Sequence, residues 1–445
     1  MYQQRTQQIL LYLSFCLTIV IIGCTNNKKS EIQQKISETS ENTNKKWVNL
    51  MIQGFQEFNQ NRSIIAADKI YEATELMPKK NLENYILAAM IYTANNKNKK
   101  ALLSIESATD NGFKDSELLN SIPEFSSLQK DLKWKSILEK IKLKNEEHLK
   151  SIQNPEVLKE LKVMYRKDQE ELQKYEESIS TLDSNATAQE YRDLFKKVEN
   201  RWEINRSKLD SIVNIHGWPG YKLVGEYGAK LAWAIPQHHP DVFYKETCLS
   251  LIEQSLLKND TDPNYYAELN DRIARETWQK QTYGASMKET TPYPIQDPEN
   301  VNKRRYELGL PEPIEVQAIY HGIIYNVPSK LEAQKKLRNT YENAQTDYKK
   351  FEHFVGLKTI DSAHIYLSKA IGAHGDISNE QLFQASIKLI SLNNEISYQK
   401  SLRILKVLIW RKWDNRNQIV NNKELSYLHA HKEWRTIKEL LEKSK

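Results

Sequence analysis

Cysteine, glycine and proline are all scarce in this chain of 445 residues, and each scarcity narrows the possible folds. Of the three cysteines only Cys248 lies in the body of the chain, so the fold cannot depend on an intramolecular disulfide. Its neighbours Thr247 and Leu249 favour a small buried side chain over a reactive thiol. Glycine and proline occur 13 times each, too rarely for a turn-rich all-β sandwich or barrel. The composition therefore predicts a mainly α protein.

A strong excess of either charge is also missing. Lysine and arginine together number 64 against 58 aspartate and glutamate residues, which leaves a formal net charge of +6. A dedicated nucleic-acid binder concentrates positive charge far more strongly, so we expect no nucleic-acid partner. Apolar residues make up 39% and charged residues 27%, which is enough apolar material for folded cores. At roughly 150 residues per domain, the length allows about three domains.

An apolar run near the start is too short to cross a bilayer. It extends from Ile9 to Ile22 after Arg5, whereas a membrane-spanning helix needs roughly 20 residues, so we interpret it as a signal-peptide core. Its end, Ile21-Ile22-Gly23-Cys24, resembles the bacterial lipoprotein cleavage motif. The resemblance implies a signal peptide over residues 1–24, a lipid on Cys24, and membrane attachment in the bacterial cell envelope, with the inner or outer membrane left open. The alternative is an uncleaved membrane anchor.

Residues 25–46 contain no aromatic residue and consist mainly of Asn, Lys, Ser, Glu and Gln. Such a composition cannot bury enough apolar surface to order itself. We therefore interpret this stretch as a flexible tether between the lipid and the folded body.

The folded body carries an internal similarity at a spacing of 300 residues. The matched positions are Phe113 with Trp413, Leu128 with Leu428, Trp134 with Trp434, and Ile137 with Ile437. The apolar spacing in both copies is helical, and the first copy resembles degenerate tetratricopeptide-type helical hairpins, with a period of roughly 34 residues. We predict two related helical domains, at 47–145 and 330–445. The shared tryptophans are expected in their cores.

The region 150–327 between these flanks differs in pattern. Asn154-Pro155 is a typical helix start, and apolar residues follow at helical spacing through a charge-rich stretch. A second long helix is predicted from about Ala188 to Val213, antiparallel to the first. Further along, the pattern predicts a helix over Tyr221–Ile235 that ends at Pro236, and another that opens at Asp262-Pro263.

Polar and aromatic pairs recur in this central region in a distinctive order. They are Asp168-Gln169, Gly217-Trp218-Pro219, Val224-Gly225, Gln237-His238, Asp271-Arg272, Gln281-Thr282-Tyr283-Gly284, Pro294-Ile295-Gln296-Asp297-Pro298, Arg304-Arg305 and Gly309-Leu310. This order resembles an uncharacterised bacterial family, one of the numbered domains of unknown function. The family usually continues Tyr-Gly with Thr-Gln, where this chain has Ala285-Ser286. Since the family has no established activity, the resemblance implies a domain without implying a reaction.

Two enzymatic hypotheses follow if these side chains meet. In the first, His238 is a general base oriented by Asp271, and Arg272, Arg304 and Arg305 hold an anionic substrate. The remaining candidates for ligand contacts are His216, Trp218, Gln237, Gln281 and Tyr283. In the second, His216, His238 and Asp271 bind a metal ion. No close-spaced ligand motif supports it, so we expect neither a metal nor a cofactor.

A purely structural interpretation is equally open. In that case Gln237 and His238 satisfy backbone groups at a helix end, Asp271 pairs with an arginine, and Trp218 and Tyr283 belong to the core. The function expected first is binding or scaffolding at the cell envelope, with a protein partner held by the helical flanks. The alternative is a hydrolase-like activity on an anionic substrate in the central region.

Overall fold

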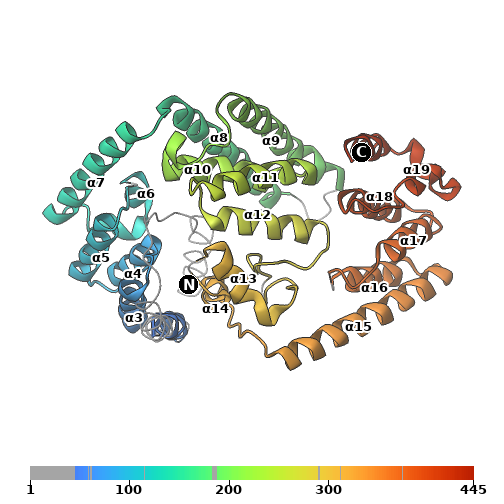
Figure 1. The fold of residues 1–445 in the computed structure, drawn as a ribbon, viewed down its shortest axis with the longest axis horizontal. Coiled ribbons are helices and arrows are strands. Elements are labelled where there is room, and N and C mark those ends of the chain that lie inside the picture. Colours follow the sequence, from blue (N-terminus) through green and yellow to red (C-terminus); the bar gives the residue numbers. More distant parts are fainter. Residues whose placement is uncertain are drawn as a thin grey trace. The chain divides into compact units, whose positions relative to one another are not determined.

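The structure is a computed structural model that describes residues 46–58, 60, 63–114, 116–182, 188–288, 291–310, 312–372 and 374–444. The predicted signal peptide 1–24 with Cys24, and the tether 25–46 apart from Lys46, lie outside the described residues. Within those residues no strand occurs, and the only bridges are Gln281 with Ile295 and Met287 with Pro292. The prediction of a mainly α protein is confirmed (Figure 1). Across the same residues, no helix has both the length and the apolar character needed to span a membrane.

The chain divides into two compact units, each assembled from three segments of sequence. The first unit takes Met1–His238, Leu251–Tyr265 and Gly309–Tyr325, and the second takes His239–Ser250, Tyr266–Leu308 and Asn326–Lys445. The central region therefore contributes residues to both units.

The first unit begins with short helices that pack in sequence order. After a helix over residues 46–58 come α3 (Ser63–Leu76), α4 (Leu82–Ala94), α5 (Asn98–Asp110), α6 (Ser116–Ser121), η1 (Pro123–Ser127) and α7 (Leu132–Ser151). Helix α4 packs on both α3 and α5, and it is buried along nearly its whole length. Their core includes Tyr85, Ile105, Phe125 and Trp134.

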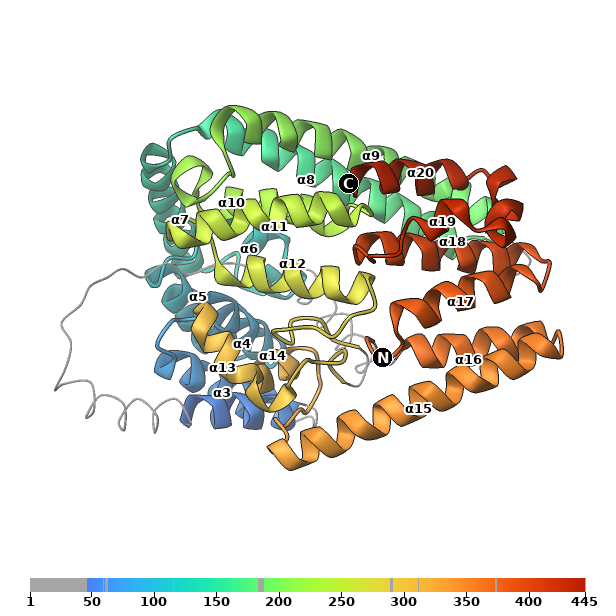
Figure 2. The same cartoon turned by 45° about the vertical axis from the view of Figure 1, so that its right-hand side comes forward.

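Three longer helices follow in the first unit: α8 (Pro155–Ser180), α9 (Ala188–His216) and α10 (Tyr221–His238). Helix α8 begins as predicted, because the Asn154 side chain accepts a hydrogen bond from the N–H of Val157 at 3.2 Å. Helices α8 and α9 lie side by side in both ribbon views, and α10 packs on α8 (Figures 1 and 2).

The predicted end of α10 at Pro236 is wrong, because the helix continues to His238. A proline removes the hydrogen bond that its own N–H would donate, and its ring crowds the carbonyl one turn earlier, so a helix extends past it at a cost. The break lies instead at Gly225, near the start of α10, where φ is 71° and ψ is 175°.

Two helices, α11 (Val242–Leu257) and α12 (Pro263–Glu276), contain residues of both units. Helix α12 begins at Pro263 as predicted. The first unit also holds α14 (Ile314–Tyr320). The second unit holds η2 (Pro298–Asn300), α13 (Val301–Leu308), α15 (Lys330–Gly356), α16 (Ile360–Gly372), α17 (Asn379–Ile390), α18 (Glu395–Trp410), α19 (Gln418–Asn421), η3 (Lys423–Ala430) and α20 (Trp434–Lys443).

The segments that are similar at a spacing of 300 residues also have similar local structure. The turn after α5 has a hydrogen bond from the Phe113 N–H to the Ala108 carbonyl at 2.9 Å. At the matching position after α18, the Trp413 N–H donates to the Leu408 carbonyl at 3.1 Å. Trp134 and Trp434 are each 2% exposed, so both have the core position expected for them.

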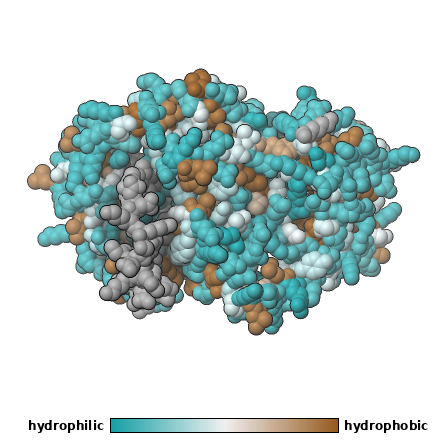
Figure 3. Space-filling view, in the orientation of Figure 1, coloured by the Kyte–Doolittle hydropathy of each residue, from teal (hydrophilic) through white to brown (hydrophobic). Residues whose placement is uncertain are grey.

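The surface drawn in Figure 3 is mostly hydrophilic, with apolar residues scattered over it. Among the described residues, the exposed large apolar side chains come from many different elements, from Leu132 in α7 to Tyr427 in η3. Single exposed apolar residues are normal for proteins in water. Cys248 is buried, as predicted.

Candidate functional site

His238 contacts a buried carboxylate of the first unit. Its Nδ1 lies 2.7 Å from Oδ2 of Asp168, a residue of α8 that is 4% exposed. An ionised carboxylate can only accept hydrogen bonds, so in this contact Nδ1 is the donor, and in the neutral form of such an imidazole the lone pair lies on Nε2. The His238 side chain is 27% exposed, which leaves part of the ring open to solvent. We call Asp168 and His238 the dyad.

The sequence of α8 explains why this carboxylate is buried. The buried residues Leu158, Leu161, Met164 and Asp168 follow at intervals of three or four, so the aspartate occupies the next position of an apolar stripe. A buried carboxylate needs hydrogen-bond partners. The second donor to Oδ2 is the Nε2 amide group of Gln169, at 3.1 Å. The two contacts fix the orientation of the carboxylate and, through it, that of the imidazole.

Helix α9 brings buried polar atoms to the same place. The rings of Trp202 and His238 are 6.4 Å apart between centroids, and Asn205 donates from Nδ2 to the Met164 carbonyl, one turn before Asp168. Within the described part of the chain, three buried atoms of α9 have no hydrogen-bond partner: Nε of Arg201, Nε1 of Trp202 and Oδ1 of Asn205. Of the three residues, Trp202 is the one whose ring neighbours that of His238, and a buried N–H without a partner is a candidate donor to a bound water or ligand.

The other candidates in the first unit lie at the ends of α9 and α10. His216 is the exposed last residue of α9, and no side-chain hydrogen bond or ring contact joins it to another described residue. Trp218 follows Gly217, whose φ is 76°, and is 8% exposed. Gln237 precedes His238 and is 7% exposed. Over the described ranges, no group of three or more His, Cys, Asp or Glu side chains is placed to hold a metal ion.

Asp271 belongs to a different network, in the second unit. It is fully buried in α12 and accepts hydrogen bonds from the backbone N–H groups of Thr282 at 2.7 Å, Tyr283 at 3.0 Å and Ala285 at 2.9 Å. Burial raises the pKa of the Asp271 carboxyl, and these N–H groups act in the opposite direction. Both carboxylate oxygens of Asp271 thus stabilise the turn at residues 282–285. The carboxylate that orients His238 is Asp168, in the role predicted for Asp271.

Gln281 and the paired arginines complete this network. The Gln281 amide is 1% exposed, accepts from the Ser286 N–H at 2.9 Å and donates to the carbonyls of Ser286 and Tyr293. Arg304 donates to the carbonyls of Thr282, Gln296 and Asp297, and Arg305, itself 1% exposed, donates to the Tyr283 carbonyl at 3.0 Å. Irregular backbone that is buried must have its polar groups satisfied. The side chains predicted to hold an anion satisfy carbonyl groups instead.

Comparison with protein families agrees with the predicted resemblance. Residues 155–323 match a family model described as "Family of unknown function (DUF6624)". The central region is a DUF6624 domain. No curated protein and no solved structure matches the chain.

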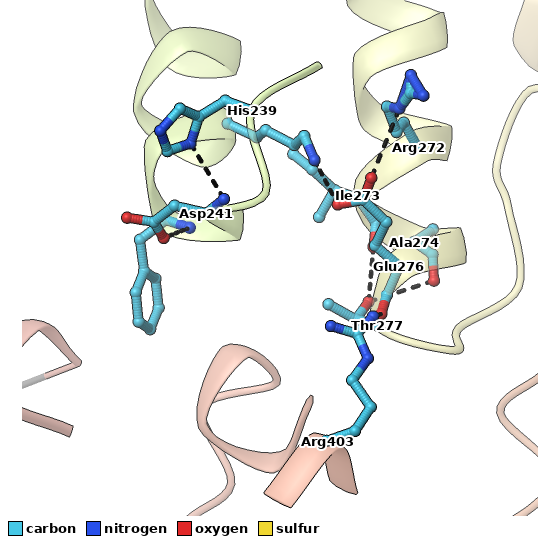
Figure 4. A network of polar contacts seen from close by, with 10 residues as sticks. His239, Asp241, Arg272, Ile273, Ala274, Glu276, Thr277 and Arg403 are labelled. Carbon is cyan, nitrogen blue, oxygen red and sulfur yellow. Dashed lines mark hydrogen bonds and ion pairs between the residues drawn. The ribbon is translucent and has the colours of Figure 1, made fainter. Parts of the chain in front are cut away.

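Arg272 of the DUF6624 domain lies in a buried ionic network (Figure 4). Its Nε is 3.5 Å from Oε1 of Glu276, and Nζ of Lys245, a residue 1% exposed, contacts the other oxygen of the same carboxylate. Burial lowers the pKa of Lys245 to about 8, and the attraction of Glu276 opposes that shift. The Glu276 carbonyl accepts from Arg403 of α18 at 3.0 Å. Arg272, predicted to hold a substrate anion, thus already pairs with a carboxylate.

The prediction of site residues missed Asp168, Trp202 and Asn205. One sequence signal for Asp168 was present: a single carboxylate on an otherwise apolar helix stripe needs a buried partner. No comparable signal marked the residues of α9, because tryptophan and asparagine on a helix stripe are ordinary core residues of the DUF6624 domain.

Proposed function

We propose that the DUF6624 domain is a hydrolase-like enzyme in which His238 is the general base and Asp168 orients it. The observation that carries the proposal is the 2.7 Å contact between Nδ1 of His238 and a carboxylate that is 4% exposed. A buried carboxylate holds the imidazole in one tautomer and stabilises the imidazolium that forms during proton transfer.

The reaction begins with a water molecule at Nε2 of His238. Nε2 accepts a proton from this water while the water oxygen forms a bond to the carbonyl carbon or phosphorus of an ester. The negative charge that develops on the substrate oxygen is stabilised by an N–H donor, for which Nε1 of Trp202 is the candidate. The imidazolium then returns its proton to the departing alkoxide.

The test compares the full chain with matched variants on p-nitrophenyl acetate and bis(p-nitrophenyl) phosphate. We expect His238→Asn to lose about 10²–10⁴-fold in turnover, the usual contribution of general-base catalysis. Asp168→Asn should lose activity as well, because the neutral amide no longer stabilises the imidazolium and its NH2 group can hold the imidazole in the other tautomer. His353→Asn, on the exposed surface of α15, is the control and should match the wild type. Equal turnover by wild type and His238→Asn, or no turnover of either ester by the wild type, would contradict the proposal.

We also propose that Cys24 carries a lipid that attaches the protein to a membrane of the bacterial cell envelope. The support is the motif Ile21-Ile22-Gly23-Cys24. Each methylene of an acyl chain adds about 0.8 kcal/mol of membrane affinity, so several chains on one cysteine make stable attachment. Binding or scaffolding of a protein partner by the helical flanks stays a prediction.

The anchor is tested by cell fractionation of Cys24→Ala, with Cys16→Ala as the matched control because Cys16 lies in the apolar run and outside the motif. We expect Cys24→Ala to be absent from the membrane fraction and to incorporate no labelled palmitate. Cys16→Ala should remain in the membrane fraction and incorporate the label. Labelled palmitate on Cys24→Ala would show that the assignment is mistaken.

A further inference from the structure

Tyr293 of the second unit is surrounded by basic groups. Cζ of Arg275 is 5.4 Å and Nζ of Lys288 is 5.0 Å from the centroid of the Tyr293 ring. The ring of His374 is 5.5 Å from the same centroid. Arg275 lies in the last turn of α12, Lys288 follows the turn that Asp271 holds, and His374 lies between α16 and α17. We call Arg275, Lys288 and His374 the basic cluster.

Among the described residues, the two side chains of the cluster that always carry charge have no carboxylate partner. Neither Arg275 nor Lys288 forms an ion pair or a side-chain hydrogen bond there, and each lies over the Tyr293 ring. Two carboxylates of the second unit already pair with other cations: Asp376 Oδ1 lies 2.6 Å from Nζ of Lys280, and Glu276 pairs with Lys245 and Arg272. Two cations beside one aromatic ring repel each other, and an anion bound to both relieves that repulsion.

The basic groups around Tyr293 also affect the pKa of His374. It is 6% exposed, and its Nδ1 lies 3.2 Å from the Gln279 carbonyl. Burial lowers the pKa of His374, and Lys288, Arg411 and Arg275 lower it further, against the effect of Gln279. Arg411 donates from Nε and Nη2 to the carbonyls of Thr277 and Trp278 and from Nη1 to the Asn379 side chain. All three of its guanidinium nitrogens therefore bind within the protein. Arg275 and Lys288 keep their donors for a ligand.

We propose that Arg275 and Lys288 bind a phosphate-type oxyanion beside the Tyr293 ring. A guanidinium group offers paired donors that match two oxygens of a phosphate, and an ammonium group adds a compact point charge. Two cations also match the charge of a phosphate dianion. The ligand is free phosphate or the phosphate group of an organic molecule. This proposal does not depend on the hydrolase activity, since it concerns different residues.

The test measures binding of inorganic phosphate to the full chain at pH 7 by titration calorimetry, at constant ionic strength set with chloride. We expect a Kd of about 1 mM or tighter, as for a small ligand held by a few charged contacts. Lys288→Gln and Arg275→Gln should each weaken binding about 10-fold. The control is Lys303→Gln, which changes an exposed lysine that pairs with Glu307 at 3.9 Å, and it should bind like the wild type.

A second measurement follows His374 by proton NMR. Bound phosphate adds negative charge beside the imidazole, so phosphate should raise the pKa of His374, whereas chloride at equal ionic strength should not. Phenyl phosphate in place of phosphate tells the two ligand sources apart, because an organic phosphate ligand should bind more tightly than the free ion. Lys288 is exposed, so its substitution leaves the fold intact. Absence of phosphate binding to the wild type, or equal affinity in Lys288→Gln and Lys303→Gln, would overturn the proposal.

Discussion

The variant Asp271→Ala is expected to lose about 3–5 kcal/mol of unfolding free energy, the usual cost of removing one partner from a buried, charged hydrogen-bond network. The side chain of Asp271 is fully buried, and its loss leaves the backbone N–H groups of Thr282, Tyr283 and Ala285 without an acceptor. Water cannot easily replace it at a site that is sealed from solvent. Urea unfolding followed by circular dichroism gives the change in free energy.

Two further variants test whether the loss of stability comes from the hydrogen bonds of Asp271 or from removing any carboxylate. Asp271→Asn keeps one acceptor oxygen and places an amide N–H against the Ala285 N–H, so its loss should fall between those of wild type and alanine. Glu307→Ala removes an exposed carboxylate 3.9 Å from Lys303 and should change stability by less than about 1 kcal/mol. Hydrogen exchange of the three backbone amides should speed up in Asp271→Ala. Protection equal to wild type at these amides would show that the carboxylate does not hold the turn.

The sequence predicted the elements of the fold that depend on local chemistry. Asn154-Pro155 and Asp262-Pro263 mark real helix starts, because a capping side chain and a proline in the first turn act within four residues. The spacing of apolar residues placed Trp134 and Trp434 in cores for the same reason. Pro236 misled the prediction, because whether a helix continues past a proline depends on what packs around it.

Pairing between distant residues was beyond the reach of sequence patterns. Asp168 and His238 are 70 positions apart, and only the packing of α10 on α8 makes them neighbours. The polar residues from Asp271 to Arg305 resemble catalytic residues in composition. They are polar because a buried irregular segment needs side chains to satisfy its backbone, a demand that the one-dimensional pattern does not distinguish from catalysis.

The ordered polar pairs of the DUF6624 domain therefore divide into two classes with different physical causes. Asp168 and His238 contact each other through side-chain atoms, Oδ2 of the carboxylate and Nδ1 of the imidazole. Asp271, Gln281, Arg304 and Arg305 bind backbone groups, and substituting any of them acts first on the stability of the second unit. A variant of the second class can therefore lose activity because it unfolds. Such a loss indicates a catalytic role only when the stability of the variant equals that of the wild type.

Gly225→Ala is expected to lose about 2–6 kcal/mol of unfolding free energy. With φ at 71° and ψ at 175°, Gly225 has a backbone conformation that costs a residue with a side chain about 1–3 kcal/mol. A methyl group there would also overlap the ring of His148 in α7 and lie 3.2 Å from Cγ2 of Ile152. Packing an extra carbon into a filled space adds about 1–3 kcal/mol. Thermal and urea unfolding measure the sum.

The two contributions are separable in the first unit. His148→Ala empties the space that the new methyl group needs, so Gly225→Ala should cost less in the His148→Ala background, and what remains is backbone strain. The control is Gly372→Ala at the end of α16, where an added Cβ meets no atom within 4 Å and φ is not positive. That variant should match the wild type or gain up to about 1 kcal/mol, because alanine narrows the unfolded ensemble. Equal stability of Gly225→Ala and Gly372→Ala would mean that α10 does not turn at Gly225 in solution, and the Asp168–His238 contact at its far end would then need a different helix path.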